Sequence, residues 1–155
     1  MIDVFVYFDN KETELLHESS FVQTRGEIII NGTQLKGLDF ENYLKTSYEN
    51  LPFDGNYCFV KKEKENVIIS VDHVRSYPLF YSIDNNKLLV SDSAIWIYNQ
   101  SSNNEYDDLA NNELWLSGYV LGAKTLYSNI KQVLPGELIK FSYKNEKINV
   151  FKERF

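Results

Sequence analysis

The sequence is divided into short runs of β-branched and aromatic residues, separated by Gly, Asn, Asp or charged residues. Such runs are typical of β-strands. Residues 82–87 and 143–147 place polar, Asn-containing segments between two runs and predict hairpin turns, because Asn and Asp tolerate left-handed backbone conformations. Consecutive hairpins predict antiparallel sheet. The predicted strands are residues 3–8, 27–31, 56–61, 67–72, 78–83, 87–91, 137–143 and 147–151.

Three segments have helical rather than alternating patterns: residues 39–49, 93–99 and 113–119. In the first, Asp39 can cap the amino end, and Phe40, Tyr43 and Leu44 follow at helical spacing. The Asn-rich polar segment 99–113 is predicted to be a flexible loop. Few helices among groups of strands predict an α+β layered protein.

Length and charge limit the classes of function. A chain of 155 residues that is 43% hydrophobic can bury one ordinary core, so we expect residues 1–155 to form a single domain. The net charge of −6 and the scattered Lys and Arg residues argue against nucleic-acid binding. No apolar stretch reaches the roughly 18 residues of a membrane span, and no signal peptide precedes the first predicted strand. We therefore predict a cytoplasmic protein that does not bind membranes.

The chain has one cysteine, Cys58, and two histidines, His17 and His73. These numbers predict neither a disulfide framework nor a metal site. Alternation in the strand around Cys58 places Tyr57, Phe59 and Lys61 on one face, and Asn56, Cys58 and Val60 on the other. Cys58 is expected to be a buried, unreactive thiol. In the segment around His73, Asp72 and Arg75 are expected to pair or to cap backbone groups in a turn.

Four segments occur in a specific order: DGNYCFV at 54–60, VDHVRSYPLFY at 71–81, LLVSDSAIWI at 88–97, and the segment 117–141 that contains TLY and LPG. In order and spacing they resemble the N-terminal glutaminase domain of the asparagine synthetase family. The residues that carry the resemblance, and that we expect to be structural, are Asp54, Gly55, Asp72, Pro78, Leu79, Tyr81, Pro135 and Gly136.

The resemblance implies a class II glutamine amidotransferase with the N-terminal-nucleophile hydrolase fold, an αββα sandwich of two stacked antiparallel sheets. In that family an N-terminal Cys, exposed by removal of the initiator Met, attacks the glutamine amide. Position 2 of this chain is Ile2, which cannot act as a nucleophile. We therefore assign no catalytic residue and predict a degenerate, catalytically inactive domain.

Weaker similarities mark a vestigial glutamine pocket. Arg25 resembles the family's Arg that pairs with the substrate carboxylate, Asn31 and Gly32 resemble its oxyanion-hole pair, and Asp39 resembles the Asp that holds the substrate amine. The intervals between them are shorter than in the active family. The alternative interpretation is structural: a surface Arg before a turn, an Asn-Gly turn, and a helix cap.

No Gly-rich phosphate loop is present in the sequence, so we expect no cofactor in this chain. ATP and magnesium would belong to an asparagine-synthetase-like domain, attached in cis or acting in trans, which the resemblance implies as the partner. A homodimer is left open, as is whether Trp115 and Tyr119 pack inward or against a second domain. Two alternatives to a structural or regulatory role remain: binding of a glutamine-like amino acid, and amide hydrolysis by another nucleophile such as Cys58 or Ser70.

Overall fold

The structure is a computed structural model that describes residues 3–8, 20–46, 52–84, 86–144 and 147–155. Several sequence predictions lie outside the described residues. They concern Ile2, His17, the end of the first predicted helix at 47–49, and the centres of two predicted turns at 85 and 145–146.

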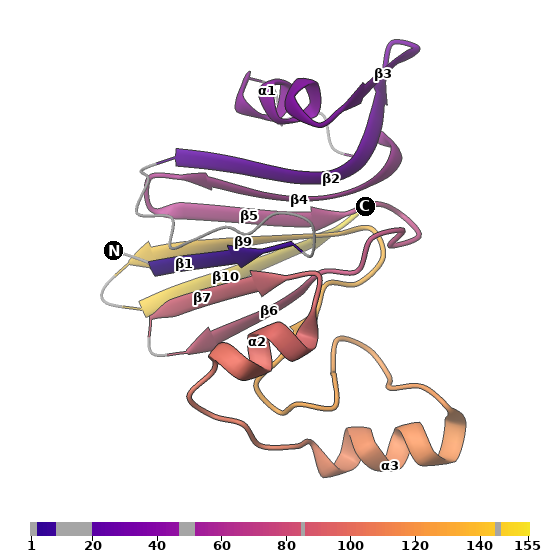
Figure 1. The fold of residues 1–155 in the computed structure, drawn as a ribbon, viewed down its shortest axis with the longest axis vertical. Helices are drawn as coiled ribbons and strands as arrows, with labels where there is room; N and C mark the ends of the chain where they lie inside the picture. Colours follow the sequence, from indigo (N-terminus) through magenta and orange to yellow (C-terminus); the bar gives the residue numbers. More distant parts are fainter. Residues whose placement is uncertain (1–2, 9–19, 47–51, 85, 145–146) are drawn as a thin grey trace.

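Two β-sheets pack face to face, and a short helix lies on the outer side of each (Figure 1). The larger sheet has the order β10 (Lys147–Arg154), β9 (Glu137–Lys144), β5 (Asn66–Val71), β4 (Asp54–Glu63), β2 (Ser20–Ile30) and β3 (Thr33–Lys36). The smaller sheet has the order β1 (Asp3–Tyr7), β7 (Lys87–Ser91), β6 (Phe80–Asp84) and β8 (Lys131–Gln132). The helices are α1 (Leu38–Thr46), α2 (Ala94–Gln100) and α3 (Asp108–Ser117). This arrangement confirms the predicted α+β sandwich.

The main hydrophobic core lies between the two sheets. It receives side chains such as Val60 and Ile69 from the larger sheet and Val6 and Val90 from the smaller one. In strand β4, successive side chains point to opposite faces of the sheet and so enter two different cores. Cys58 and Val60 face this inter-sheet core, whereas Tyr57 and Phe59 face a second core beneath α1, as the sequence predicted.

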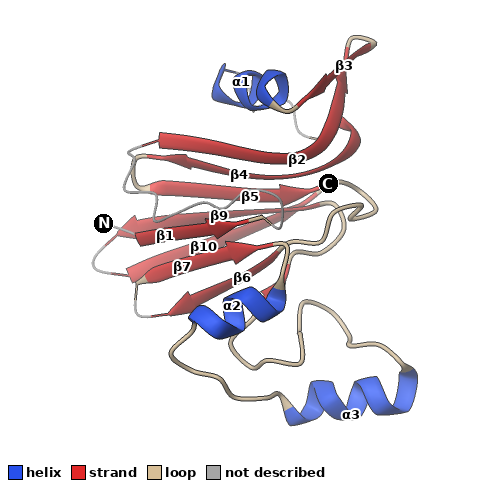
Figure 2. Ribbon diagram, viewed as in Figure 1, coloured by secondary structure: helices blue, strands red, loops and turns tan. Residues whose placement is uncertain are grey.

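Helix α1 lies at the β2–β3 edge of the larger sheet (Figure 2) and packs on the face turned away from the inter-sheet core. Phe40 and Leu44 are fully buried against the sheet, since they lie on one side of the helix. Lys61 of β4 reaches the carboxyl end of α1, where its Nζ donates a hydrogen bond to the Leu44 carbonyl at 2.6 Å. The same Nζ pairs with Glu63 at 2.7 Å. A cation at this end of a helix is favourable because the helix carbonyls point towards it.

The largest differences from the sequence prediction concern β2, β3 and β8, of which the two-residue strand β8 was not predicted. Strand β2 begins at Ser20 rather than at residue 27, and it pairs with β4 from Ser20↔Glu63 to Ile29↔Asp54. Its first half lacks clear alternation, so the pairing partner and not the local pattern determines its length. Strand β3 was not predicted. It follows a two-residue turn at Asn31 and Gly32, whose φ angles of 49° and 79° suit a hairpin turn.

The smaller sheet is not entirely antiparallel. Strand β1 pairs with β7 in parallel, with Asp3 opposite Lys87 and Tyr7 opposite Ser91. The two strands are far apart in the sequence, so no hairpin turn determines their relative direction. The hairpins predicted from local sequence, β6–β7 and β9–β10, are both antiparallel as expected.

Helix α3 corrects two predictions, since residues 99–113 are not all loop and the helix ends before Tyr119. Asp107 is the N-cap, with its side chain accepting a hydrogen bond from the Ala110 amide at 2.9 Å. Gly118 ends the helix in a left-handed conformation with φ of 80°. Trp115 and Tyr119 are exposed and do not pack inward. None of the helices among the described residues is long and apolar enough to cross a membrane.

Gly55 should be intolerant of substitution, because a Cβ there would lie 2.4 Å from the Glu27 carbonyl oxygen and φ is +129°. We expect Gly55→Ala to lower the free energy of unfolding by about 3 kcal/mol. Gly122→Ala is the matched control: its φ is +66° but no atom lies within 4 Å of the added Cβ. This control variant should lower the free energy of unfolding by about 1 kcal/mol. Urea unfolding of both variants measures the difference, and equal losses would contradict the role of close backbone approach.

Candidate functional site

The buried carboxylate of Asp72, which follows β5, connects several segments at one end of the sandwich. Its Oδ2 accepts hydrogen bonds from the backbone amides of Tyr57 and Ser76, both at 3.0 Å. Its Oδ1 accepts from the Val74 amide at 2.9 Å and from the Ser76 hydroxyl at 3.2 Å. A buried carboxylate is stable when such donors replace its water. The prediction that Asp72 caps backbone groups in this turn is confirmed.

The backbone carbonyl of Asp72 extends the same network. It accepts from the Arg75 amide at 3.1 Å and from the Gly136 amide at 2.9 Å. Gly136 in turn accepts from the Phe155 amide at 3.0 Å, and the Phe155 ring meets the His73 ring edge to face at 5.3 Å. A Cβ on Gly136 would lie 2.9 Å from the Phe155 carbonyl oxygen. The LPG turn therefore provides the close approach that holds Phe155 beside Asp72.

Arg25 of β2 forms an ion pair with Asp92, which directly follows β7. The guanidinium also lies over the Tyr77 ring, 5.3 Å from its centroid. The Asp92 side chain is only 3% exposed, so the pair is shielded from water on that side. This contact joins the two sheets at the same end as the Asp72 network, because Arg25 stands opposite Cys58 in the β2–β4 register.

Cys58 lies fully buried beneath these charges. Burial raises the pKa of its thiol to about 12, with the negative charge of Asp92 adding to the effect. At neutral pH this thiol is protonated, and a protonated thiol is a poor nucleophile. Ser70 is also fully buried, and its hydroxyl donates to the Glu137 carbonyl at 3.1 Å. Neither side chain has the exposed, base-activated arrangement that nucleophilic catalysis needs.

The residues of the expected glutamine pocket are distributed over different parts of the molecule. Arg25 lies within β2, whereas Asn31 and Gly32 form the exposed β2–β3 turn. Five residues of β2 lie between Arg25 and Asn31, and a fully extended strand of that length spans about 20 Å. Asp39 is exposed within the first turn of α1, which already begins at Leu38, so Asp39 is not the N-cap that the sequence predicted. Arg25 and Asn31 are therefore not brought together.

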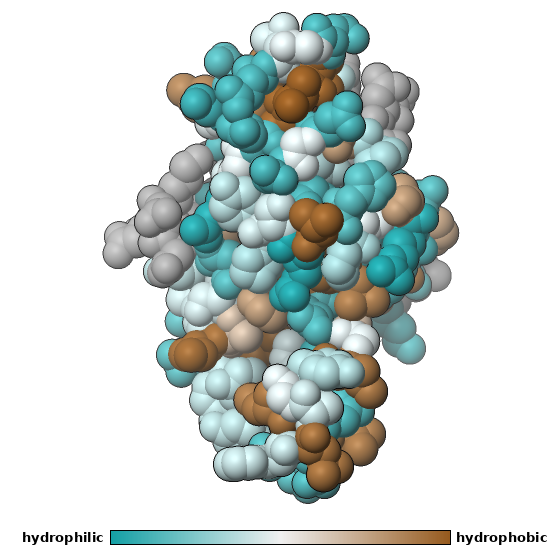
Figure 3. All heavy atoms as spheres, turned by 90° about the vertical axis from the view of Figure 1, so that its right-hand side faces the viewer, coloured by the Kyte–Doolittle hydropathy of each residue, from teal (hydrophilic) through white to brown (hydrophobic). Residues whose placement is uncertain are grey.

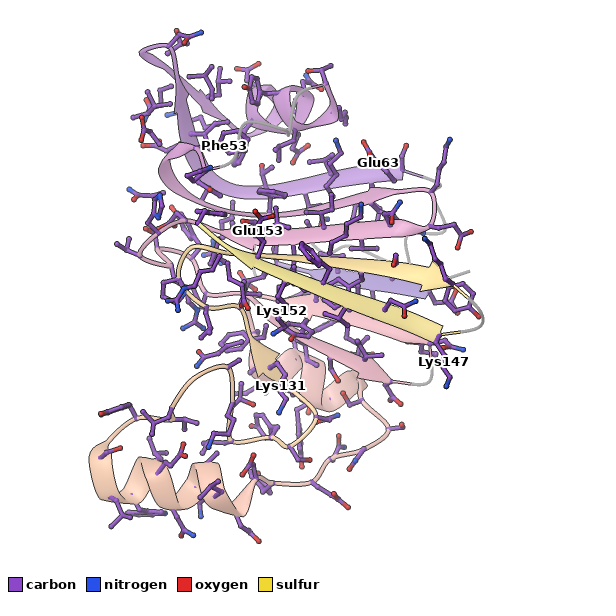
Figure 4. The ribbon with its side chains drawn as sticks, turned by 180° about the vertical axis from the view of Figure 1, so that it is seen from behind. Phe53, Glu63, Lys131, Lys147, Lys152 and Glu153 are labelled. Atoms are coloured by element: carbon purple, nitrogen blue, oxygen red, sulfur yellow. The ribbon has the colours of Figure 1, made fainter. Side chains whose placement is uncertain are left out.

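The remaining motif residues contact the core or its edges. The Leu79 carbonyl accepts from the Val133 amide at 2.8 Å, and the Tyr81 ring packs against Phe141 at 5.3 Å. Lys152, on the β10 strand seen in Figure 4, lies 5.4 Å from the Tyr81 ring centroid. Asp54 and Pro78 are exposed, and Pro135 is partly buried.

The sequence model of the glutamine amidotransferase domain matches residues 23–152, which is most of the chain. The chain belongs to the glutamine amidotransferase domain family. The match begins within β2 and ends within β10, so it includes both the Asp72 network and the Arg25–Asp92 pair. No curated protein matches the chain.

In this glutamine amidotransferase domain, sequence reasoning did not identify the partner of Arg25. Asp92 is 67 residues away from Arg25 in the sequence, so no local spacing connects them. Its position immediately after a predicted strand was the only available signal. Among the described residues, no group of three His, Cys, Asp or Glu side chains could hold a metal ion.

Replacing the Asp72 carboxylate should destabilise the fold. Asp72→Asn keeps the size of the side chain but turns an NH2 group towards amide donors, so we expect a loss of about 3 kcal/mol in the free energy of unfolding. Asp54→Asn is the control, since Asp54 belongs to the same set of motif residues but is exposed. It should change stability by less than about 0.5 kcal/mol. Similar losses in the two variants, measured by urea unfolding, would refute the role assigned to the Asp72 network.

The raised pKa of Cys58 predicts slow reaction with thiol reagents. In the folded domain at pH 8, labelling by Ellman's reagent should be about 1,000-fold slower than in the urea-unfolded chain, since the thiolate is scarce and buried. A Cys58→Ala, Asn112→Cys variant moves the only thiol to an exposed helix position and should react at about the unfolded rate. Equally fast labelling of native Cys58 would show that this thiol is accessible.

Proposed function

We propose that this glutamine amidotransferase domain does not hydrolyse glutamine and has a structural or regulatory role beside an ATP-dependent, asparagine-synthetase-like domain. That partner would be attached in cis or bind in trans, and ATP and magnesium would belong to it. The observation that carries the proposal is the ion pair between Arg25 and Asp92. Arg25 is the residue expected to bind the substrate carboxylate, and here it pairs with a carboxylate of the protein.

The Arg25–Asp92 pair supports loss of substrate binding. A glutamine carboxylate at Arg25 would have to share the guanidinium with the Asp92 carboxylate or displace it, and Asp92 is nearly inaccessible to water. Breaking this ion pair is costly, because the shielded Asp92 carboxylate would lose part of the interaction that compensates its removal from water. The pair therefore competes directly with the ligand that Arg25 is expected to bind.

The geometry of β1 also supports loss of catalysis. Arg25 meets Asp92 beyond the carboxyl end of β7, which lies beside Tyr7 in the parallel β1–β7 pair. Asp3 begins β1 at its other end, about 13 Å away along an extended strand. Ile2, which precedes β1 in the sequence, has a side chain that cannot act as a nucleophile. The side chain at position 2 and the distance along β1 both argue against attack on a glutamine held at Arg25.

The roles of the motif residues support a retained scaffold. Asp72, Gly55 and Gly136 make backbone contacts that the fold needs whether or not a substrate binds. These residues can therefore persist after catalysis is lost. A domain of this kind can support or regulate a neighbouring enzyme without chemistry of its own.

The purified chain should release no ammonia from glutamine, and millimolar glutamine should not raise its thermal midpoint, since only a ligand of the native state stabilises it. Asparagine and glutamate should behave in the same way. Arg25→Gln provides a comparison, because ammonia release that this variant abolishes would demonstrate a working site at Arg25 and overturn the proposal. Stabilisation without hydrolysis would instead favour an amino-acid-binding function.

A further inference from the structure

Residues 105–128 form an arm that extends from the smaller sheet and has α3 at its tip. Its two connecting segments are held together by the Asp107 amide, which donates to the Leu126 carbonyl at 2.9 Å, and by the Ser128 amide, which donates to the Glu105 carbonyl at 3.0 Å. The rings of Tyr98 and Tyr127, 4.5 Å apart, pack at the base of the arm. Figure 1 shows α3 standing apart from both sheets.

The tip of the arm is internally ordered. Glu113 of α3 accepts a hydrogen bond from the Leu121 amide at 3.0 Å and forms an ion pair with Lys124. Gln132 of β8 donates from its side chain to the Gly122 carbonyl at 2.7 Å. These contacts fix the loop after α3 against the helix and against the smaller sheet, so the side chains of the tip are presented in a defined arrangement.

Large apolar side chains cover this tip. Trp115 is 82% exposed and Leu116 is 89% exposed, and Ala110 is the only residue of α3 that is buried. Figure 3 shows apolar side chains gathered at this lower end of the molecule. We define the tip surface as Leu109, Trp115, Leu116, Tyr119 and Leu121, all exposed. A helix of ten residues is marginal in water without tertiary packing, and no described element makes an extended contact with α3.

The charge of the arm indicates whether the tip surface binds a second copy of this chain or a different partner. Residues 105–128 contain four acidic residues, Glu105, Asp107, Asp108 and Glu113, and one basic residue, Lys124, which pairs with Glu113. Two copies joined through this surface would bring the acidic groups together, which is unfavourable. A partner with Lys or Arg around an apolar groove would match both the tip surface and its acidic margin.

We propose that the tip surface is the docking site for the synthetase-like domain, which would present an apolar groove with a basic rim. This inference rests on the function proposed above and identifies the surface that contacts the partner. Burying Trp115 and Tyr119 alone would remove roughly 300 Å² from water. That is a large part of the about 800 Å² that a standard interface takes from each partner.

Site-specific photo-crosslinking in the full-length protein, expressed in its native cells, tests the proposal. p-Benzoylphenylalanine in place of Trp115 should crosslink to a synthetase-like domain, as a linked peptide within the same chain or as a larger species. The same probe in place of Leu38, which is 74% exposed on α1, is the matched control and should not. Trp115→Ser with Leu116→Ser should weaken association with the captured domain by about 30-fold or more, whereas Leu38→Ser should not.

Three results would overturn the proposal. Crosslinking from position 115 to a second copy of this chain would make the tip surface a homodimer interface. Crosslinking to a protein without a synthetase-like domain would assign the surface to another partner. Equal or absent crosslinking from positions 115 and 38 would show that the tip surface is not a docking site. Glutamine hydrolysis by the purified chain would reject the proposed function by a separate measurement, so the two failures are distinguishable.

Discussion

The hydrogen bonds of Asp72 connect most of the structure at one end of the sandwich. A carboxylate can remain buried there because backbone amides and one hydroxyl saturate its oxygens. The backbone carbonyl of Asp72 also accepts a hydrogen bond from the amide of Gly136 in the LPG turn, and the Gly136 carbonyl accepts one from the Phe155 amide. Two sequence motifs that are far apart in the chain therefore meet at one residue, in the segment where the chain passes from β5 of the larger sheet to β6 of the smaller sheet.

Charged groups at the same end are paired within the protein. Arg25 of the larger sheet forms an ion pair with Asp92, which follows β7 of the smaller sheet. Cys58, the only thiol, is buried beneath that pair with a raised pKa. Removing one partner of such a pair is destabilising, because the shielded charge that remains loses much of its compensation.

The arm presents the opposite situation. Its backbone groups are satisfied by internal hydrogen bonds, whereas the apolar side chains of Trp115 and Leu116 remain in water. Exposed apolar groups on an ordered support are typical of interaction surfaces. The molecule thus has one end where polar groups are closed off within the protein and another where an apolar surface is available to a partner.

Local patterns in the sequence predicted most of the strands, the two hairpins, the α+β class and the motifs that resemble the family. These features depend on residues close together in the chain, which share one periodicity or one turn. The three-dimensional structure was needed to find the parallel pairing of β1 with β7, the full length of β2 and the contact between Arg25 and Asp92. Each of these joins segments distant in sequence, and pairing between such segments depends on the packing of the whole core rather than on any local pattern.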